Sequence, residues 1–334
     1  MNRAKDVAQL CGVSISTVSR VLAGKTCVKE STRKRILEAV EKTGYRPNIM
    51  AQNLKLGKNS VIAIIIPSID NLIYPPLVRG IEDVVNEQNY IVTVCNTDED
   101  EEKETHFINR FLNRGLAGLI VATLRKKSTQ IKKFKDKNFP IVLTNRAYDK
   151  SFDTVVVDNH QAAYKMINVL ISGGCKHIAY ASADPDLFLY EQRFCGYKDA
   201  LQDAHIPFKK EYVMEDNGDP NSLYGKTKDL LKNHPEIDAV AASNDFRAFV
   251  ISQAVTDMGF RIPQDISVTG FDGIEVGKYM TPSLTTVYQP LREMGACAAN
   301  RLLEQINHKE QTGSFLPPET IVLPTEIILR QSTR

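Results

Sequence analysis

The chain has 334 residues, of which 43% are hydrophobic and 25% charged, and its formal net charge is +2. This length exceeds what a single hydrophobic core usually supports, so we expect two or three domains. The longest apolar run, residues 61–67, is far too short to cross a bilayer and no apolar signal segment is visible, which excludes a membrane protein and favours a cytoplasmic one.

Positive charge is concentrated near the N-terminus. Residues 1–60 contain 12 of the 42 lysines and arginines but only 4 of the 40 aspartates and glutamates, so this segment is basic and the remainder is acidic. A basic module attached to an acidic body favours a polyanionic partner, and nucleic acid is the first to consider. The six cysteines are scattered without metal-ligand spacing, which predicts free thiols and no metal site.

Two short helices joined by a tight turn are predicted at residues 4–11 and 15–23. In the first, apolar residues recur at the i, i+3, i+4 and i+7 positions that form one face of a helix. Gly12 suits the left-handed conformation that ends a helix, and Ser14 can cap the next one. This pattern is typical of the helix-turn-helix unit that reads DNA.

A third helix is predicted at residues 30–43, and Gly44 would end it. Its apolar residues fall on one stripe, which would pack on the first two helices. The stripe consists of Ile36, Leu37 and Val40.

The outer, N-terminal face of the second helix is expected to enter the major groove. Arg20 can form a bidentate pair with guanine, worth about 1–3 kcal/mol of discrimination between bases. Thr17 and Ser19 are better suited to phosphate contacts, which position the protein without specifying sequence. The alternative is a helical hairpin whose polar residues are merely solvated. The residues predicted to contact DNA here are Ser14, Ile15, Ser16, Thr17, Ser19 and Arg20.

Residues 47–60 form the predicted connection between the basic head and the body. The part that ends at Leu54 can form two turns of helix, with Pro47 at its entry and Asn48 as a cap. Such a short helix is unstable alone in water, so DNA and a second copy of the chain would have to hold it. The alternative is a plain linker with Leu54 packed on the body.

The body, residues 61–334, alternates short apolar strands with helical segments, which predicts a doubly wound α/β layout that occurs twice. Continuous runs of isoleucine and valine suit parallel strands that are covered on both faces. The predicted strands are residues 61–66, 91–95, 118–121, 141–144 and 154–157, followed by 177–181, 239–242 and 267–270.

Polar side chains follow these strands at the carboxyl ends, where ligands bind in such sheets. They include guanidinium, carboxamide and carboxylate groups and aromatic rings, which suit the hydroxyls and the apolar face of a sugar. Each residue alone could instead be a structural cap or turn, as Asp245 illustrates at the start of a helix. The predicted ligand contacts are Ser68, Asn71, Tyr74, Asn145, Arg146, Arg193, Asn244, Arg247, Asp272 and Gln289.

The head contains four motifs, Lys5-Asp-Val-Ala8, Gly12-Val-Ser14, Ser16-Thr-Val-Ser-Arg-Val-Leu22 and Gly44-Tyr-Arg-Pro-Asn48. In order and spacing they resemble the lactose-repressor and purine-repressor family of bacterial transcription regulators, and the similarity continues through the body. The resemblance places Ile15, Ser16 and Arg20 at base-reading positions. One departure is Lys29, because the family often has a serine or threonine there that caps the third helix.

The resemblance implies three regions: a helix-turn-helix domain at residues 1–46, a hinge helix and linker at 47–60, and an effector-binding and dimerisation domain at 61–334. In the family's hinge helix a leucine wedges into the minor groove and kinks the duplex. Leu54 takes that position in this chain, and Ala51 would let two hinge helices approach each other.

The effector domain implied by the resemblance has the two-lobed fold of periplasmic sugar-binding proteins. Its N-lobe would span about residues 61–158 and 290–318, and its C-lobe about 159–289 and 319–334. The last crossing between lobes would therefore lie near Pro318. The same resemblance gives the effector contacts in the C-lobe, which are Arg193, Asn244, Asp272 and Gln289.

Arg247 departs from the family pattern, in which that position is commonly apolar. If Arg146 and Arg193 face the same cleft, the three arginines favour an anionic effector such as a sugar acid or a sugar phosphate. The alternative is an Arg247 at the surface, paired with Asp245 or Glu275.

No catalytic constellation is visible. The phosphate-loop, dinucleotide-loop and nucleophile-elbow motifs are absent, and the histidines are dispersed, so we expect no enzyme and no cofactor. A free-standing sugar-binding protein is the main alternative, but the basic head disagrees with it. The sequence therefore predicts a homodimeric, nucleoid-associated repressor of carbohydrate-metabolism genes, which binds a near-palindromic operator and is controlled by a small sugar or sugar-acid effector.

Overall fold

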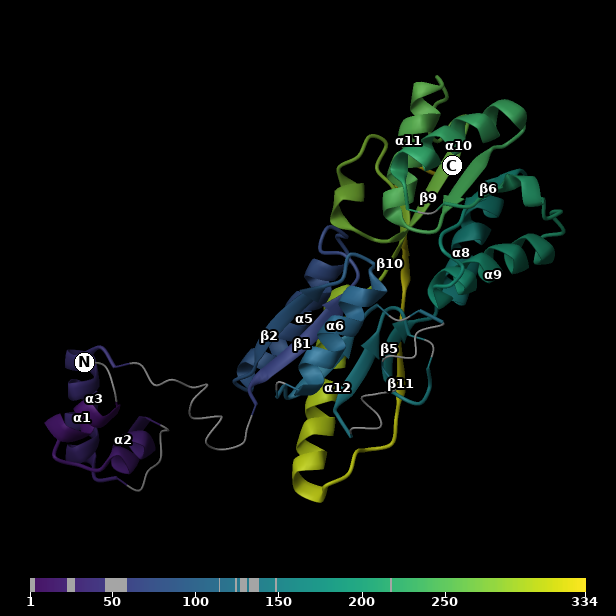
Figure 1. Cartoon of the computed structure of the whole chain (residues 1–334). Coiled ribbons are helices and arrows are strands. Elements are labelled where there is room, and N and C mark those ends of the chain that lie inside the picture. Colours follow the sequence, from purple (N-terminus) through teal and green to yellow (C-terminus); the bar gives the residue numbers. More distant parts are fainter. Residues whose placement is uncertain are drawn as a thin grey trace. The chain divides into compact units, whose positions relative to one another are not determined.

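The structure is a computed structural model of the whole chain, and it describes residues 4–22, 28–45, 59–113, 115–123, 125–126, 131, 138–147, 149–216 and 218–334. The chain divides into two compact units, Met1–Ser60 and Val61–Arg334, shown together in Figure 1. Within the described ranges, no helix is both long and apolar enough to cross a bilayer, and no group of histidine, cysteine or acidic side chains is arranged to hold a metal ion.

In its described residues, the first unit is a bundle of three helices packed around a small apolar core. Val7, Val18 and Ile36, one from each helix, are almost completely buried at its centre. The predicted all-helical head is therefore confirmed. Its helices are α1 (Ala4–Leu10), α2 (Ile15–Leu22) and α3 (Glu30–Thr43).

The turn between α1 and α2 has the features expected from its sequence. Gly12 has a φ angle of 59°, in the left-handed region where a side chain would cause strain. The Ser14 hydroxyl accepts a hydrogen bond from the Thr17 amide at 3.2 Å, which satisfies one of the free N–H groups at the start of α2. This turn fixes α2 against α1.

Helix α3 begins without a side-chain cap, because the N-cap residue is Lys29, which makes no capping hydrogen bond. Its buried stripe also differs from the prediction in one residue. Ile36 and Ala39 are buried and Val40 is half-buried, but Leu37 is 48% exposed. The i, i+3, i+4 spacing of the buried residues leaves Leu37 beside the stripe.

The second unit consists of two lobes, each built on a six-stranded sheet. In the N-lobe the strand order is β11-β5-β4-β3-β1-β2 and the paired strands run parallel. Apolar sequences such as VIAIII in β1 suit this position, because both faces of the sheet are covered. The strands are β1 (Val61–Ile66), β2 (Ile91–Asn96), β3 (Gly118–Val121), β4 (Ile141–Thr144), β5 (Asp153–Val157) and β11 (Thr320–Leu323).

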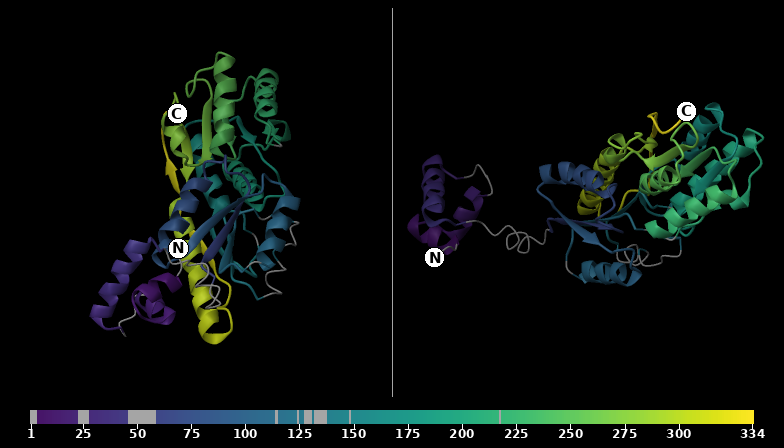
Figure 2. Two further views of the ribbon diagram at one scale, coloured as in Figure 1. Left: turned by 60° about the vertical axis from the view of Figure 1, so that its left-hand side comes forward. Right: turned by 90° about the horizontal axis from the view of Figure 1, so that it is seen from above.

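Helices cover both faces of the N-lobe sheet (Figure 2). On one face α5 (Tyr74–Glu87) and α12 (Leu291–Thr312) pack on Ile62 and Ile64 of β1. On the other face α6 (Glu101–Asn113) buries Ile108 against the alternate residues of the same strand. The lobe is therefore a three-layer sandwich.

The C-lobe repeats this plan with the strand order β12-β10-β9-β8-β6-β7, in which only the β10–β12 pair is antiparallel among the described pairs. The strands are β6 (Ile178–Ala181), β7 (Val213–Met214), β8 (Ala239–Ala242), β9 (Ser267–Asp272), β10 (Thr285–Tyr288) and β12 (Glu326–Ile328). The helices are α8 (Asn159–Ser172), α9 (Phe188–Asp203), α10 (Pro220–Asn233) and α11 (Asp245–Asp257), with 3-10 turns at Lys210–Tyr212 and Glu275–Lys278. The predicted double α/β architecture is confirmed.

The chain passes between the lobes three times. Two crossings lie after β5 and after β10, and the third lies between Leu323 and Glu326. The prediction of a third crossing near Pro318 is wrong, because β11 pairs with β5 in the N-lobe, where Thr320 is the partner of Thr154. Two consecutive prolines, Pro317 and Pro318, suggested a crossing between the lobes. In the structure they precede β11, an edge strand of the N-lobe sheet.

Helices α5 and α12 approach each other closely at two glycines. A Cβ atom added to Gly80 would overlap the carbonyl oxygen of Arg292, and one added to Gly295 would overlap that of Leu77. The crossing buries Leu77, Ile81 and Met294 in the core of the N-lobe. Backbone contact at this crossing therefore requires glycine at both positions.

We expect Gly80→Ala to lower the free energy of unfolding by about 1–3 kcal/mol, because the backbone of α12 cannot yield to the added methyl group. The matched control is Gly225→Ala in α10, where no atom lies within 4 Å of the added carbon. That change should raise stability by about 0.5–1 kcal/mol through helix propensity. Urea unfolding of both variants measures the difference, and a Gly80→Ala midpoint equal to that of the parent protein contradicts this packing.

Candidate functional site

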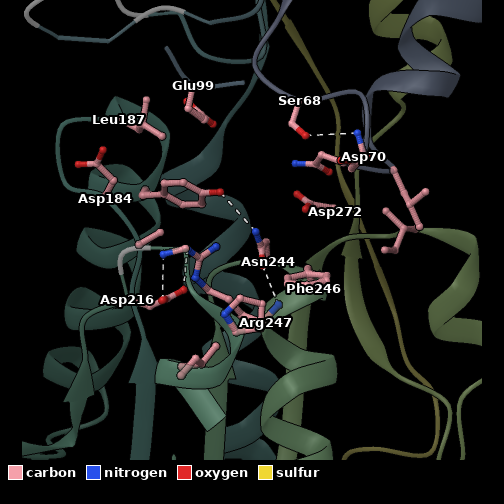
Figure 3. A pocket seen from close by; sticks show the side chains of 18 of the residues that line it. Ser68, Asp70, Glu99, Asp184, Leu187, Asp216, Asn244, Phe246, Arg247 and Asp272 are labelled. Atoms are coloured by element: carbon pink, nitrogen blue, oxygen red, sulfur yellow. Dashed lines mark hydrogen bonds and ion pairs between the residues drawn. The ribbon is translucent and has the colours of Figure 1, made fainter. Parts of the chain in front are cut away.

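A cavity of about 650 Å³ lies between the two lobes, at the carboxyl ends of strands from both sheets (Figure 3). Loops after β1, β2, β3 and β4 line it on the N-lobe side, and loops after β6, β7, β8 and β9 line it on the C-lobe side. Its polar and aromatic lining consists of Ser68, Asp70, Asn71, Glu99, Arg125, Arg146, Asp184, Tyr190, Asp216, Asn244, Phe246, Arg247, Phe249 and Asp272.

The cavity lies where the sequence analysis expected it, beyond the carboxyl ends of the parallel strands. Only some of the residues predicted to contact the ligand line it, however. Six predicted residues line the cavity: Ser68, Asn71, Arg146, Asn244, Arg247 and Asp272. Four others lie behind the lining: Tyr74, Asn145, Arg193 and Gln289. Tyr74 is buried under the N-lobe side, where its hydroxyl accepts a hydrogen bond from the Asn145 amide at 3.4 Å.

Asp272 is a buried acid of the cavity with two side-chain partners behind it. The Gln289 amide donates to its Oδ1 at 2.8 Å, and the Arg193 guanidinium lies 3.4 Å from the same atom. Burial raises the pKa of Asp272, although the charge of Arg193 opposes that shift. Arg193 and Gln289 therefore position Asp272 from behind and do not face the cavity themselves.

Arg193 is itself fixed by several groups and is only 2% exposed. Its Nε donates to the side chain of Asn159 at 2.8 Å, and one terminal nitrogen donates to the Ser243 carbonyl at 2.7 Å. The guanidinium also lies 3.5 Å from the centre of the Phe271 ring. These contacts hold the guanidinium in one orientation.

Asn244 has a structural role and also lines the cavity. As the N-cap of α11, it accepts a hydrogen bond from the Arg247 amide at 2.9 Å. Its side-chain nitrogen lies 3.3 Å from the hydroxyl of Tyr190, a cavity residue that the sequence analysis did not select. The cap thus fixes the orientation of the Asn244 side chain in the cavity wall.

Arg247 is buried and not at the surface. Its terminal nitrogen lies 3.0 Å from Asp216 Oδ2, and both side chains are at least nine-tenths buried. The expected alternative, a surface pair with Asp245 or Glu275, is therefore wrong. Asp216 follows the two-residue strand β7, which has no clear sequence signal, so sequence reasoning missed it.

On the N-lobe side Arg146 is paired with Glu99. Its two terminal nitrogens donate to the two carboxylate oxygens at 2.8 and 2.6 Å, a bidentate arrangement. Burial alone would raise the pKa of Glu99, but the hydrogen bonds and charge of Arg146, with those of Arg125, lower it below its ordinary value. Glu99 belongs to an acidic run that resembles a solvated helix start, which explains why the sequence analysis did not select it.

A basic pair bridges the two lobes at the rim of the cavity. Arg125, after β3, donates to Glu99 of the N-lobe at 3.0 Å and to Asp184 of the C-lobe at 2.7 Å. The neighbouring Lys126 lies 2.9 Å from Glu191, and its backbone amide donates to the Asp186 carbonyl at 3.1 Å. Because Glu99 also holds Arg146, the bridge and the cavity share one carboxylate.

Negative charge exceeds positive charge in the cavity lining. Its described residues include five carboxylates, on Asp70, Glu99, Asp184, Asp216 and Asp272, but only three guanidiniums, on Arg125, Arg146 and Arg247. Each guanidinium is already paired with a carboxylate. The arrangement therefore offers many hydrogen-bond donors and acceptors but no net positive charge for an anion.

In the first unit, α2 presents a polar face away from the core. Ile15 is 51% exposed, Ser16, Ser19 and Arg20 are exposed, and Thr17 is half-buried. The Ser14 hydroxyl lies 2.7 Å from that of Ser16 and 2.8 Å from that of Thr17. The other predicted DNA contacts, Asn48, Ala51 and Leu54, lie outside the described residues.

Family models match both units of the chain. One described as "Bacterial regulatory proteins, lacI family" matches residues 4–48, and one described as "Periplasmic binding proteins and sugar binding domain of LacI family" matches residues 59–317. Catabolite control protein A of Priestia megaterium is 33% identical over 331 residues, 98% of each chain. The ribose operon repressor of Halalkalibacterium halodurans is 31% identical over 334 residues, all of this chain and 98% of the repressor.

Solved structures agree with these matches. The lac repressor dimer bound to operator and the anti-inducer ONPF has a TM-score of 0.85 and covers 98% of each chain, and at 23% identity it shows a shared fold. A LacI family transcriptional regulator from Enterococcus faecium with bound ribose has a TM-score of 0.72 at 28% identity, over 82% of this chain and 98% of that one.

We expect Arg125→Gln to loosen the contact between the lobes, because the change removes the ion pair with Asp184. The Lys126 amide, which donates across the lobes, should then exchange with solvent deuterium several-fold faster in the ligand-free protein. Arg261→Gln is the control, since Arg261 pairs with Asp265 inside the C-lobe. Hydrogen-exchange mass spectrometry measures both, and unchanged protection at Lys126 in Arg125→Gln contradicts the bridge.

Proposed function

Because this chain belongs to the LacI family of bacterial transcriptional regulators, we propose that it represses carbohydrate-metabolism genes under the control of a sugar held between its two lobes. The observation that carries this proposal is the interlobe cavity of paired charges and carboxamides, in the same chain as a helix-turn-helix unit. The relatives described above are regulators, and we propose no catalytic role for the chain. It would act at the nucleoid, in the cytoplasm.

The exposed face of α2 supports two different roles for the proposed DNA contacts, base reading and phosphate contact. Ile15, Ser16 and Arg20 would read base edges, because all three are exposed on the face of α2 that points away from the core; Ile15 and Ser16 lie in its first turn and Arg20 in its last. Ser14, Thr17 and Ser19 would contact phosphates. Two heads related by the two-fold axis of a homodimer would read the half-sites of a near-palindrome.

We also propose that the hinge segment acts in the minor groove. Leu54 would wedge between base pairs, Asn48 would cap the hinge helix, and Ala51 would let two such helices approach each other. An effector that binds the DNA-competent and DNA-incompetent arrangements of the lobes with different affinity would then change operator binding. Release of the operator identifies an inducer, and tighter binding identifies a corepressor.

The pairing of the arginines favours an uncharged sugar over a sugar acid. The anionic-effector hypothesis depended on free guanidinium groups. Arg146 instead forms an ion pair with Glu99 at 2.6 Å, and Arg247 forms one with Asp216 at 3.0 Å. A ligand carboxylate or phosphate would have to compete with Glu99 and Asp216, and would also meet the charge of Asp70. Hydroxyl groups can donate to these carboxylates without such a cost.

We expect Arg20→Ala to lower affinity for the operator about tenfold to a hundredfold and to relax the preference at one base pair of each half-site. Arg35→Ala, which removes the same charge from the exposed surface of α3, is the matched control and should retain the sequence preference. Binding to a library of operator variants at fixed salt measures both effects. A loss that is uniform across all sequences would show that Arg20 contacts phosphate and does not read a base.

The effector class is tested by thermal shift with neutral sugars, sugar acids and sugar phosphates, followed by measurement of operator affinity with each ligand. We expect a neutral sugar to raise the melting temperature by several degrees and to change operator affinity, and its acid analogue to bind at least tenfold more weakly. A sugar phosphate that binds best would refute the uncharged effector. Operator binding without a response to any sugar would refute sugar control and leave the DNA-binding function intact.

A further inference from the structure

The cavity extends beyond the groups that one sugar ring can contact. In Figure 3, Ser68, Asp70 and Glu99 lie at one end, Asp216, Phe246 and Arg247 lie toward the other, and Asn244 and Asp272 lie between them. A water molecule in the liquid occupies about 30 Å³, so 650 Å³ corresponds to roughly twenty water-sized groups. A pyranose has fewer non-hydrogen atoms than that, so a single ring bound between Asp70 and Asp272 would leave room at the end at Arg247.

The end at Arg247 has the polar groups of a binding site. The Nε atom of Arg247 is buried and has no hydrogen-bond partner among the residues that the structure describes, although one terminal nitrogen of the same guanidinium pairs with Asp216. A buried donor without a partner is costly, and a ligand oxygen placed there would satisfy it. Because Asp216 neutralises the guanidinium, the fitting oxygen is an uncharged hydroxyl or ether and not a carboxylate.

The same end has an apolar surface suited to the face of a ring. Phe246 is 55% exposed although it lies in the wall of the cavity, and Phe249, Leu223 and Pro220 line the space beside it. An exposed aromatic ring next to paired donors and acceptors is the combination that binds the C–H face and the hydroxyls of a sugar ring. Polar groups and apolar surface therefore occur together at this second position.

We propose that Asp216, Arg247 and Phe246 form a second-ring subsite, so that the effector is a neutral disaccharide. One ring lies between the N-lobe loops and Asn244 and Asp272, and the second lies on Phe246. A hydroxyl of the second ring accepts from Arg247 Nε, and another donates to Asp216. This inference rests on the proposed sugar-controlled function and narrows its ligand class.

The test is calorimetry on the full-length protein with maltose, cellobiose, sucrose and trehalose, and with glucose, fructose and ribose as monosaccharides. We expect at least one disaccharide to bind tenfold or more tightly than any of the monosaccharides. Phe246→Ala should then weaken that disaccharide about tenfold and change monosaccharide affinity less than twofold. Phe208→Ala is the control, because Phe208 is also an exposed phenylalanine but does not line this cavity.

A second variant, Arg247→Lys, keeps a positive charge beside Asp216 but removes the guanidinium Nε donor. It should retain the melting temperature within a few degrees and lose most of the preference for the disaccharide. A monosaccharide that binds as tightly as every disaccharide, or a Phe246→Ala effect that is equal for both ligand sizes, overturns the subsite and leaves sugar control standing. The absence of binding by every sugar in the panel overturns both proposals.

Discussion

The burial of one carboxylate, Asp272, sets the arrangement around the cavity. A buried charge is tolerated only with partners, and here they come from Arg193 of α9 and from Gln289, which follows β10. Arg193 is in turn held by Asn159, the first residue of the C-lobe helix that follows β5. Since Asn159 and Gln289 lie at two of the crossings between the lobes, one hydrogen-bonded cluster connects the ligand cavity to the hinge.

The regular part of the fold could be predicted because its signals are local. Strands such as β1 and β3 are continuous apolar runs. In the first unit, Gly12 follows the end of α1 and Gly44 follows the end of α3. The strands β7, β10, β11 and β12 were not predicted, because β7 has two residues, β10 is rich in threonine, and β11 and β12 are half-exposed. Their assignment depends on pairing partners far away in the sequence, and the misplaced third crossing near Pro318 has the same cause.

The site could be predicted in position but not in detail. The rule that ligands bind beyond parallel strands selected Asn71, Asn244 and Asp272 correctly as lining residues. The same rule cannot distinguish a residue that lines the cavity from one that supports the lining. It therefore selected Arg193 and Gln289, which contact Asp272 but do not line the cavity. The partners of the arginines come from distant loops, so counting arginines without their carboxylates suggested an anionic ligand.

The order of strands also determines when each lobe can form during synthesis. The C-lobe strands β6 to β10 are contiguous in sequence, but the N-lobe core needs Met294, Ala298 and Leu302 of α12, which are translated after them. Both lobes therefore need the C-terminal part of the chain, since β11 completes the N-lobe sheet and β12 completes the C-lobe sheet, and one face of the N-lobe sheet stays uncovered until α12 emerges. A chain that ends before α12 would not be a shorter regulator, because its N-lobe would expose Ile62 and Ile64 to aggregation.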